Sequence, residues 1–367
     1  MRWFVPLLAV LALSGCVSDS AEEPPTGPKR DIPIGLAANV DGSGPVATEM
    51  AVIRRAGAHW LREDLEWARV EPQPGVRDWA YFDKIVEAAA RNSVEVLPIL
   101  DESPCWAVKP GTAPDECWKL LPEDAAFARF GHAAVARYGP GGDFWRAHPD
   151  LDPKFAVRAW EVWNEPYLHT GAQPVSASRY SGLFEAVADA GRAEDPQSKW
   201  LFAGAAKGTR EDGSQFDWLP AVAEVRPELA TKISALSVHV YPVYKDGEAL
   251  NATAGTAAVV ETFEQSFGTP VTAWVTELGF AACDRNLGED RCVPGEDRAA
   301  REIQKAKLMT QGINQFRRTT FTDAVFVYTL REFDTFFYGD SGLLRANGDR
   351  LPAYAAFKKA ATAADGP

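Results

Sequence analysis

The feature that most constrains the fold is a repeated alternation, after residue 30, between short β-branched or aromatic runs and longer Ala-rich amphipathic segments. Short apolar runs favour buried strands and helical periodicity favours amphipathic helices, so the alternation predicts eight βα units around a parallel sheet. The predicted strands are residues 34–38, 60–65, 94–100, 156–163, 200–205, 233–241, 271–277 and 324–330. The predicted helices are residues 46–56, 80–92, 123–138, 178–194, 216–225, 254–267, 297–316 and 353–363.

Eight such units can form an open doubly wound sheet or close into a barrel. No Gly-rich phosphate-binding loop follows the first predicted strand, which favours closure. We therefore predict a (β/α)8 TIM barrel that occupies residues 31–367 as a single domain. In such a barrel the reactive side chains lie at the carboxyl ends of the strands.

The first 15 residues have the pattern of an export signal, with Arg2 before an apolar run at residues 4–13 that is too short to span a membrane. The run ends in Leu-Ser-Gly-Cys at residues 13–16, which resembles the lipobox of bacterial lipoproteins. The resemblance implies that Cys16 carries a lipid, which would be the only membrane attachment and would hold the protein on the extracytoplasmic face. An ordinary secretory signal is the alternative. Residues 16–30 are predicted to be a flexible tether.

The remaining four cysteines form two local pairs, Cys105 with Cys117 and Cys283 with Cys292. An oxidising compartment favours disulfides within these pairs, although four cysteines permit three connectivities. A zinc site is the weaker alternative, because the spacing is not that of a zinc knuckle and no His lies beside either pair. We expect neither a metal nor another cofactor.

The charge and the aromatic content restrict the ligands. The formal net charge is -13 and no basic stretch interrupts it, which argues against nucleic acid. Twelve Trp, nine Tyr and nineteen Phe suit the apolar faces of sugars as well as a core.

Two glutamates end two predicted strands. Glu165 follows Asn164 after the fourth strand, and Glu277 ends the seventh. Strands four and seven can face one another across a barrel mouth, and paired carboxylates are what glycosidic cleavage requires: one as an acid and one to attack or stabilise the anomeric carbon. The alternative is that each glutamate only binds a loop or a helix terminus.

Nearby residues have the chemistry to support this pair. Arg62, in the second strand, would be costly in a barrel without a carboxylate partner, and Glu277 is the expected one. His239 and Tyr241 share one face at the end of the sixth strand, and a phenol there can donate to Glu277. A lone His at a rim can also be purely structural. Glu63 and Glu161 are expected to face the other side of their strands.

Two segments resemble a known clan of enzymes. The run Trp-Glu-Val-Trp-Asn-Glu-Pro at residues 160–166 resembles the acid/base signature of clan A retaining glycoside hydrolases, and Trp-Val-Thr-Glu-Leu-Gly at residues 274–279 resembles their nucleophile strand. Residues 79–86 and 136–139 are similar to segments of families 39 and 5 of that clan. The resemblance implies the following roles: Glu165 as acid/base, Glu277 as nucleophile, Asn164 as donor to the sugar 2-hydroxyl, and Arg62, His239 and Tyr241 as supporting residues.

The sequence departs from that clan after the eighth strand. Clan members commonly present a Trp there as a sugar platform, whereas residues 328–333 hold none. Arg331 instead puts a cation near the mouth, which suits an acidic or heavily hydroxylated sugar or an ion pair with Glu332 or Asp334. Trp106 and Trp118, beside the first cysteine pair, either line the cleft or pack within their loop.

Together these features predict a retaining β-glycosidase, monomeric and exported, that acts on an extracellular or cell-envelope oligo- or polysaccharide. A surface sugar-binding barrel without turnover is one alternative. A transglycosylase, which shares every catalytic part, is another.

Overall fold

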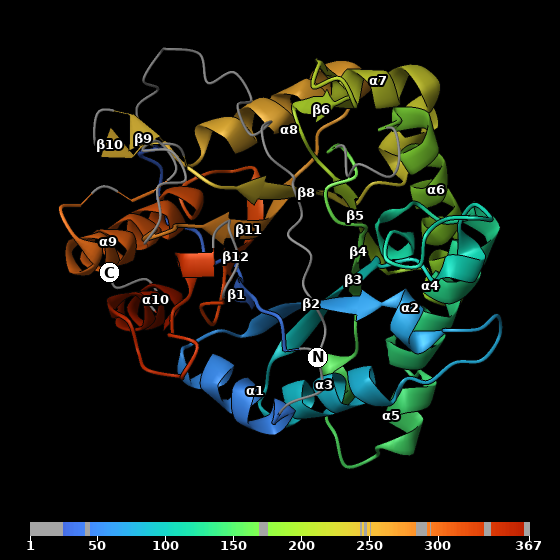
Figure 1. Ribbon diagram of the computed structural model, residues 1–367, viewed down its shortest axis with the longest axis horizontal. Helices are drawn as coiled ribbons and strands as arrows, with labels where there is room; N and C mark the ends of the chain where they lie inside the picture. Colours follow the sequence, from blue (N-terminus) through green and yellow to red (C-terminus); the bar gives the residue numbers. More distant parts are fainter. Residues whose placement is uncertain are drawn as a thin grey trace.

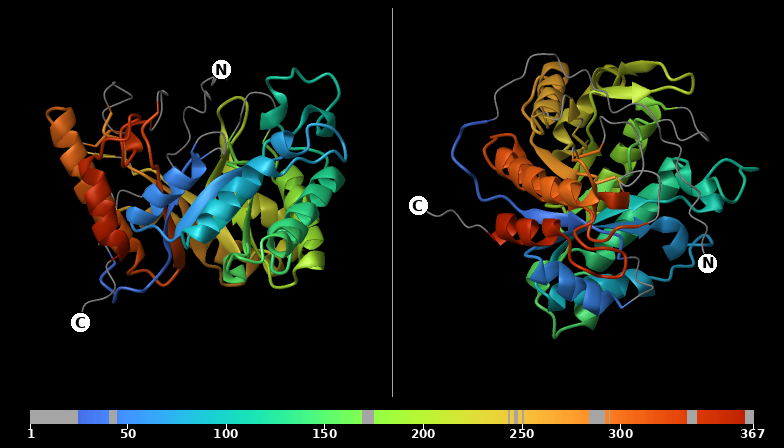
Figure 2. Two further views of the ribbon diagram at one scale, coloured as in Figure 1. Left: turned by 90° about the horizontal axis from the view of Figure 1, so that it is seen from below. Right: turned by 60° about the vertical axis from the view of Figure 1, so that its left-hand side comes forward.

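Eight parallel strands close into a barrel in the computed structural model of the protein, and the helices surround them in all views (Figures 1 and 2). The order around the ring is β1-β12-β11-β8-β5-β4-β3-β2. The structure describes residues 25–40, 45–168, 175–242, 244–245, 248–249, 251–283, 292–293, 295–333 and 339–362. The predicted single-domain (β/α)8 barrel is confirmed. The proposed signal, Cys16 and most of the proposed tether lie outside the described residues.

The observed elements agree with the predicted ones to within a few residues. The barrel strands are β1 (Ile34–Ala37), β2 (Trp60–Glu66), β3 (Glu95–Asp101), β4 (Ala159–Val162), β5 (Lys199–Ala203), β8 (Ala235–Val240), β11 (Ala273–Gly279) and β12 (Thr322–Tyr328). The predicted helices are α1 (Val46–Arg55), α3 (Ala80–Arg91), α4 (Asp124–Tyr138), α6 (Ala177–Glu194), α7 (Trp218–Val225), α8 (Ala254–Phe267), α9 (Arg298–Phe316) and α10 (Pro352–Thr362).

Several short elements were not predicted, because each is too short for its periodic pattern to repeat more than about once. They are the helices α2 (Trp67–Val70) and α5 (Asp143–Ala147) and the two-stranded pairs β6 (Lys207–Thr209) with β7 (Gln215–Asp217) and β9 (Tyr244–Lys245) with β10 (Glu248–Ala249). The prediction that a helix starts at residue 216 was wrong by two residues, since residues 215–217 pair with β6 instead.

The barrel interior has an apolar layer with a polar layer above it. The apolar layer takes side chains from all eight strands: Ala37, Trp60, Leu97, Ala159, Leu201, Ala235, Trp274, Ala324 and Phe326. Side chains alternate along a strand, so the residue two positions further on points inward as well. This places Arg62, Glu161 and Ser237 directly above Trp60, Ala159 and Ala235. The polar layer lies toward the carboxyl ends of the strands, where the chemistry of a barrel is expected.

The chain enters the barrel at the opposite end. The Arg30 guanidinium donates to the carbonyl oxygens of Thr319, Thr320 and Thr322, which lie between α9 and the start of β12. The Arg30 backbone N–H donates to the carbonyl of Arg317, 2.7 Å away. Residue 30 is therefore fixed at the amino-terminal face of the barrel. None of the helices in the described ranges is long and apolar enough to cross a membrane.

Candidate active site

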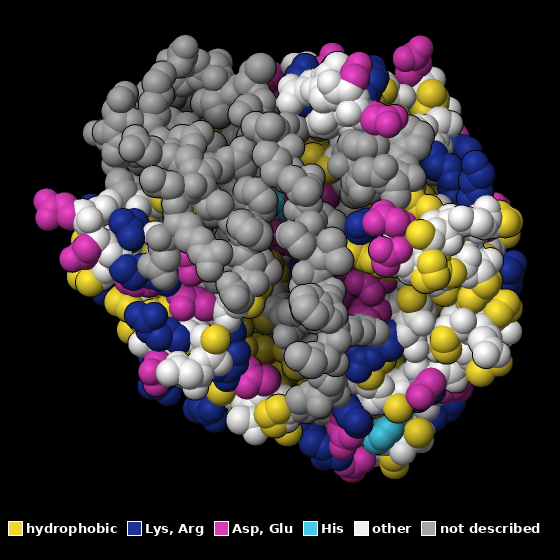
Figure 3. Space-filling view, viewed as in Figure 1, with side chains coloured by type: hydrophobic (Ala, Val, Ile, Leu, Met, Phe, Trp, Pro, Cys, Tyr) yellow, Lys and Arg dark blue, Asp and Glu magenta, His cyan; other side chains and the backbone are white. Residues whose placement is uncertain are grey.

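A cavity of about 750 Å3 opens at the carboxyl ends of the strands. Its lining comes from the ends of β1, β2, β3, β4, β11 and β12 and from the loops that follow them, and it includes Arg62, Asn164 and Glu277. Around it, acidic and basic side chains are interspersed over the described part of the visible face (Figure 3). The mixture provides no broad basic surface on that part of the molecule for a polyanion.

Glu165 and Glu277 approach the same imidazole. The Nδ1 atom of His239 lies 3.0 Å from Oε1 of Glu165 and 3.6 Å from Oε2 of Glu277. These two oxygens are therefore no more than 6.6 Å apart, the sum of 3.0 and 3.6 Å. The structure thus brings together two carboxylates that are 112 positions apart in the sequence (277 minus 165). Retaining glycosidases have carboxyl groups about 5–5.5 Å apart and inverting ones about 6.5–9.5 Å.

The backbone turns sharply where Glu165 leaves β4. Trp163 has φ 63° and Glu165 has φ 45°, both in the left-handed region that favours glycine. Each such residue costs roughly 1–3 kcal/mol and persists only where the surrounding structure holds it. Two of them within three residues re-aim Glu165 toward His239 after the regular alternation of β4 has ended.

A β-bulge re-aims Glu277 in the same way. Along β11, alternation from the inward-facing Trp274 would place Thr276 inside and Glu277 outside. The register against β8 shifts between Val275 and Glu277, so that Glu277 pairs with His239 and Thr276 is the extra residue. Thr276 stays inside, where its hydroxyl lies 2.7 Å from that of Ser237. Glu277, the next residue, also points into the barrel.

Arg62 connects the carboxylates of the polar layer. It is 6% exposed, and its Nη1 donates to Glu277 at 2.9 Å. Its Nε and Nη2 donate to the two oxygens of Glu161 at 2.5 and 3.1 Å. Burial alone would lower the pKa of Arg62, but the charges of Glu161 and Glu277 outweigh it and raise the pKa well above its ordinary value. Arg62 is therefore a permanent cation beside the predicted nucleophile.

The expectation that Glu161 faces away from the site was wrong. Glu63, by contrast, lies outside the barrel interior, where its carboxylate accepts a hydrogen bond from the backbone N–H of Val40. Glu161 is 1% exposed and points inward. Burial alone would raise its pKa, but Arg62 and His239 outweigh burial and lower the pKa to about 2. Glu161 is thus a permanent anion, and Arg62 has two carboxylate partners rather than the single one predicted.

Asn164 lies at the mouth and is held by the same arginine. Its Oδ1 accepts from Nη2 of Arg62 at 3.2 Å, and the residue is exposed on the cavity wall. With Oδ1 turned to Arg62, the amide NH2 points the other way. The geometry suits a donor to a bound hydroxyl.

His239 is surrounded by acids. Its side chain is 3% exposed, and besides Glu165 and Glu277 it has Glu161, whose Oε1 lies 3.9 Å from the Nε2 of His239. Burial alone would lower the pKa of His239, but the charge of Glu277 and hydrogen bonds with Glu161 and Glu165 raise the pKa to about 10. The ring is therefore an imidazolium at neutral pH, and it supplies positive charge between the two candidate catalytic carboxylates.

Tyr241 donates its hydroxyl hydrogen to Oε2 of Glu277. Burial and the charge of Glu277 both raise the pKa of this phenol, so it remains a donor. Gly279 makes this approach possible, since a Cβ on residue 279 would lie 2.2 Å from the Tyr241 ring. The glycine of the Glu-Leu-Gly run is therefore explained by packing against a residue of the site.

The two tryptophans beside the first cysteine pair have different environments. Trp106 packs edge-on against Trp67 and donates its Nε1 hydrogen to the carbonyl of Glu71, so its contacts favour loop packing over the predicted substrate binding. Trp118 lines the cavity. It lies on η2 (Cys117–Lys119), and its Nε1 donates to the carbonyl of Asp115.

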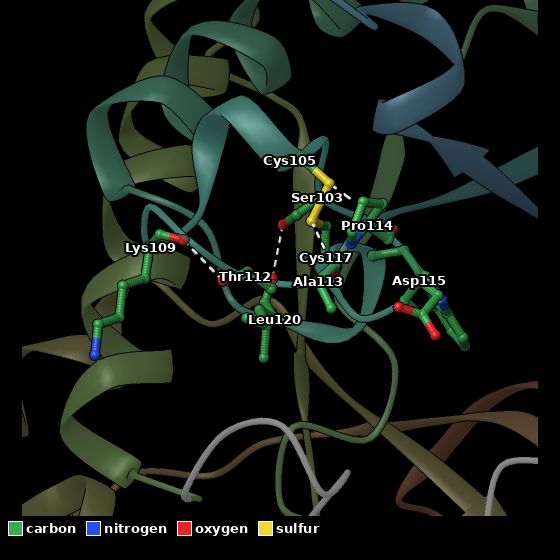
Figure 4. The surroundings of a disulfide bond; sticks show 10 residues. Ser103, Cys105, Lys109, Thr112, Ala113, Pro114, Asp115, Cys117 and Leu120 are labelled. Carbon is green, nitrogen blue, oxygen red and sulfur yellow. Dashed lines mark hydrogen bonds between the residues drawn. A yellow bond between two sulfur atoms is a disulfide. The ribbon is translucent and has the colours of Figure 1, made fainter.

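Both predicted disulfides are present, Cys105–Cys117 and Cys283–Cys292. The first closes the loop after β3 that carries Trp118, and Figure 4 shows it beside the hydrogen bonds from Ser103 to Leu120 and from Thr112 to Lys109. The loop therefore has internal support on both sides of the cross-link.

Arg331 lines the cavity, as predicted, but the predicted ion pair with Glu332 was wrong. Its guanidinium binds both oxygens of Glu49 in α1, at 2.8 and 2.7 Å, while Glu332 binds Arg298. Asp334 lies outside the described residues. Tyr328, at the end of β12, also lines the cavity at the strand position where the expected Trp is missing.

Sequence reasoning missed four acidic residues of the cavity, Glu49, Asp64, Asp101 and Glu102. Of these, Asp64 and Asp101 lie on barrel strands and could have been found with the rule that was applied to Glu277. Asp64 lies two positions after Arg62 and so shares its face, and Asp101 is the last residue of β3. Within the described residues, no cluster of His, Cys, Asp or Glu has the arrangement of a metal site.

The sequence matches no known protein-family model and no curated protein. Its structure is similar to a family 39 glycoside hydrolase from Bacteroides cellulosilyticus WH2, with a TM-score of 0.63, 18% identity, and coverage of 92% of this chain and 65% of that one. It is also similar to a monomeric β-xylosidase from Caulobacter crescentus CB15, with a TM-score of 0.62, 19% identity and coverage of 91% and 69%.

A third similar structure is native xylanase 10B from Thermotoga maritima, with a TM-score of 0.56, 13% identity, and coverage of 90% of this chain and 94% of that one. The chain spans about two thirds of the length of the family 39 structure and the β-xylosidase. At these identities the likeness establishes the fold: the chain has the TIM barrel of these glycoside hydrolases.

Proposed function

We propose that the protein is a retaining β-glycosidase that hydrolyses O-glycosidic bonds in an extracellular or cell-envelope glycan. The observation that carries the proposal is the limit of 6.6 Å between a Glu165 oxygen and a Glu277 oxygen at one cavity, set by their distances to His239. This limit includes the separation of retaining enzymes. The similar structures, which are named as glycoside hydrolases, a β-xylosidase and a xylanase, support the same class of reaction.

In the first step, Glu277 attacks the anomeric carbon while Glu165 gives its proton to the departing glycosidic oxygen. The C–O bond to the leaving group breaks as the ester to Glu277 forms. Arg62 and Tyr241 each donate a hydrogen bond to one oxygen of Glu277, which orients the carboxylate for attack.

In the second step, Glu165 takes a proton from water, and the resulting hydroxide equivalent attacks the anomeric carbon and releases Glu277. The two inversions retain the configuration. His239 lies beside both carboxylates, so its charge stabilises whichever of them is ionised.

A trapping experiment tests this mechanism. A 2-deoxy-2-fluoro aryl glycoside should inactivate the parent protein, and peptide mass spectrometry should find the sugar on Glu277. E277Q should not be labelled. E165Q should lose most activity on poor leaving groups and much less on activated ones, because only the former need the acid. E95Q is the control, since Glu95 starts β3 at the opposite end of the barrel and its loss should not affect activity. Labelling of another residue in an active protein would refute the mechanism.

Two outcomes point to other functions. Glycan binding that survives E165Q and E277Q unchanged, in a protein that hydrolyses no polysaccharide, would favour a surface sugar-binding barrel. Transfer of the sugar to an added acceptor in preference to water would favour a transglycosylase.

We also propose that Cys16 is lipidated and anchors the protein on the extracytoplasmic face of a membrane. The Leu-Ser-Gly-Cys run after a short apolar segment supports this. Growth of the expressing cells with an alkyne-bearing fatty acid should label the parent and not C16S. A parent protein that is secreted without label would refute the anchor.

A further inference from the structure

Two carboxyl groups on the barrel strands that line the cavity have no part in the mechanism above. Asp64 lies on β2, two residues beyond Arg62 on the inward face, and Asp101 ends the neighbouring strand β3. Leu97 belongs to the apolar layer of the interior, so alternation along β3 directs Asp101 inward as well. Both residues line the cavity together with Glu277.

Asp101 has an unsatisfied acceptor. It is 8% exposed, and its Oδ1 is buried without a hydrogen-bond partner. A buried carboxylate oxygen without a donor is costly, and native proteins hold few of them. Burial raises the pKa of Asp101 well above its ordinary value, and the nearby charge of Asp64 raises it further. Burial likewise raises the pKa of Asp64, to about 6, against the opposing charge of Arg62.

The cations of the cavity are already engaged. Of the described residues that line it, three are basic: Arg62 binds Glu161 and Glu277, Arg331 binds Glu49 through two hydrogen bonds, and Lys119 lies 3.0 Å from Glu116. Six of the lining residues are acidic. A second carboxylate, on a substrate, would therefore enter a site with an excess of negative charge and with no uncommitted cation among those three to receive it.

We propose that Asp64 and Asp101 form a hydroxyl-binding subsite that selects a neutral sugar unit and rejects uronic acids. The inference rests on the proposed glycosidase function and narrows its substrate class. Sugar hydroxyls both donate and accept, which matches a pair of carboxyl groups of which one holds a proton. The sequence suggested that Arg331 determines the substrate class, but the charge of Arg331 is neutralised by Glu49. We therefore assign that role to Asp64 and Asp101.

The test compares the parent with D101N and D64N, which keep the side-chain shape and replace one of the two carboxyl oxygens with an NH2 donor. Substrates are the 4-nitrophenyl β-xyloside, β-glucoside, β-galactoside, β-mannoside, β-glucuronide and free-amine β-glucosaminide. We expect the parent to prefer a neutral member, and each variant to lose roughly 10- to 100-fold in kcat/KM on it. On the mono-deoxy analogue that lacks the hydroxyl bound by Asp101, the kcat/KM of the parent should fall by the same factor. The kcat/KM of D101N should fall little further on this analogue.

D195N is the matched control. Asp195 also has a buried oxygen without a hydrogen-bond partner, but it lies between α6 and the start of β5, away from the cavity. D195N should leave kcat/KM unchanged. A merely structural role of Asp101 would lower the melting temperature of D101N and reduce activity on every analogue equally, which would overturn the inference.

Binding separates the inference from the proposed function. Calorimetry with xylobiose, cellobiose, mannobiose and galactobiose needs no turnover. If the parent binds one of these and D101N binds it at least tenfold more weakly, the subsite is supported even without hydrolysis. Hydrolysis that D101N retains in full would overturn the subsite while the glycosidase function stands. A preference for the glucuronide or the free-amine glucosaminide, or no binding of any neutral sugar, would also overturn it.

Discussion

Replacing Arg62 should damage activity and stability through different parts of one side chain. R62K keeps a positive charge but loses the planar fork that reaches Glu161, Glu277 and Asn164 at once. A lysine can hold one or two of these partners, so Glu277 is no longer fixed. A misplacement of about 1 Å at a reacting group can cost roughly 100-fold in rate, and we expect a loss of kcat/KM of about that size.

R62M removes the charge as well. Two carboxylates, with side chains 1% and 11% exposed, then lose their cation. Removal of one partner from a buried ion pair costs about 3–5 kcal/mol. For a chain of this length, that corresponds to a fall in melting temperature of about 4–7 °C. Calorimetry and assays of kcat/KM on the best aryl glycoside measure both effects on the same samples.

R317M is the matched control. Arg317 is 4% exposed and donates to the carbonyl of Ala360, far from the mouth. R317M should lower the melting temperature without changing kcat/KM per folded molecule. The double variant R62M/E161Q should be less destabilised than the two single changes together, by about 1–3 kcal/mol, because E161Q removes one of the carboxylates that R62M leaves unpaired. An R62K protein within threefold of the parent in kcat/KM, or singles that simply add, would refute this reasoning.

Three further predictions concern the surroundings of the site. The pKa of Glu161 is lowered to about 2, so the stability that Glu161 contributes is complete above its ordinary pKa of 4.5 and falls by about 3 kcal/mol as the pH drops toward 2. The pKa of His239 is raised to about 10, so the stability that His239 contributes is complete below pH 6.5 and is lost as the pH rises through 10. Melting temperatures measured across this pH range should show both losses in the parent, with the acid loss absent in E161Q and the alkaline loss absent in H239Q. If the melting temperatures of parent and variants changed with pH in the same way, the assignment of these losses to Glu161 and His239 would be contradicted. W118A should raise KM on oligosaccharides several-fold with little change in kcat, and an unchanged KM would show that the indole does not contact substrate. The double variant C105S/C117S should be destabilised by about 3 kcal/mol, as expected for a cross-link between residues 12 apart, and a melting temperature equal to that of the parent would contradict it.

The sequence predicts the barrel well because each βα unit is encoded locally. Helix α3 was predicted at residues 80–92 and is observed at Ala80–Arg91, where seven of its twelve residues are buried. Such boundaries depend on periodicity and on caps, which are read within a few residues of the chain. The order of the strands follows from the rule that successive parallel units lie side by side.

The side-chain directions at the site were harder to predict, because they depend on irregular backbone. Regular alternation ends at Trp163 and Glu165, which have left-handed backbone, and at the bulge before Glu277. At these positions the backbone turns the catalytic candidates toward the cavity in a direction that alternation does not predict. The face assigned to Glu161 was also wrong, because alternation counted from the inward-facing Ala159 directs Glu161 toward Arg62.

Partners that are distant in the sequence were also missed. Glu49 and Arg331 are 282 positions apart and meet only because β1 pairs with β12 to close the barrel. Sequence proximity instead suggested Glu332. A prediction of this pair would have required the closed ring and the positions of α1 and the loop after β12 within it.

The attachment of Arg30 at the amino-terminal face determines where a tether would leave the folded barrel. If Cys16 holds the lipid that we propose, the tether joins the barrel at the face opposite the candidate active-site cavity. An extended tether would leave the opening free to face away from the bilayer, toward surrounding glycan. Long polymers could reach Glu165 and Glu277 without having to pass between the protein and the membrane.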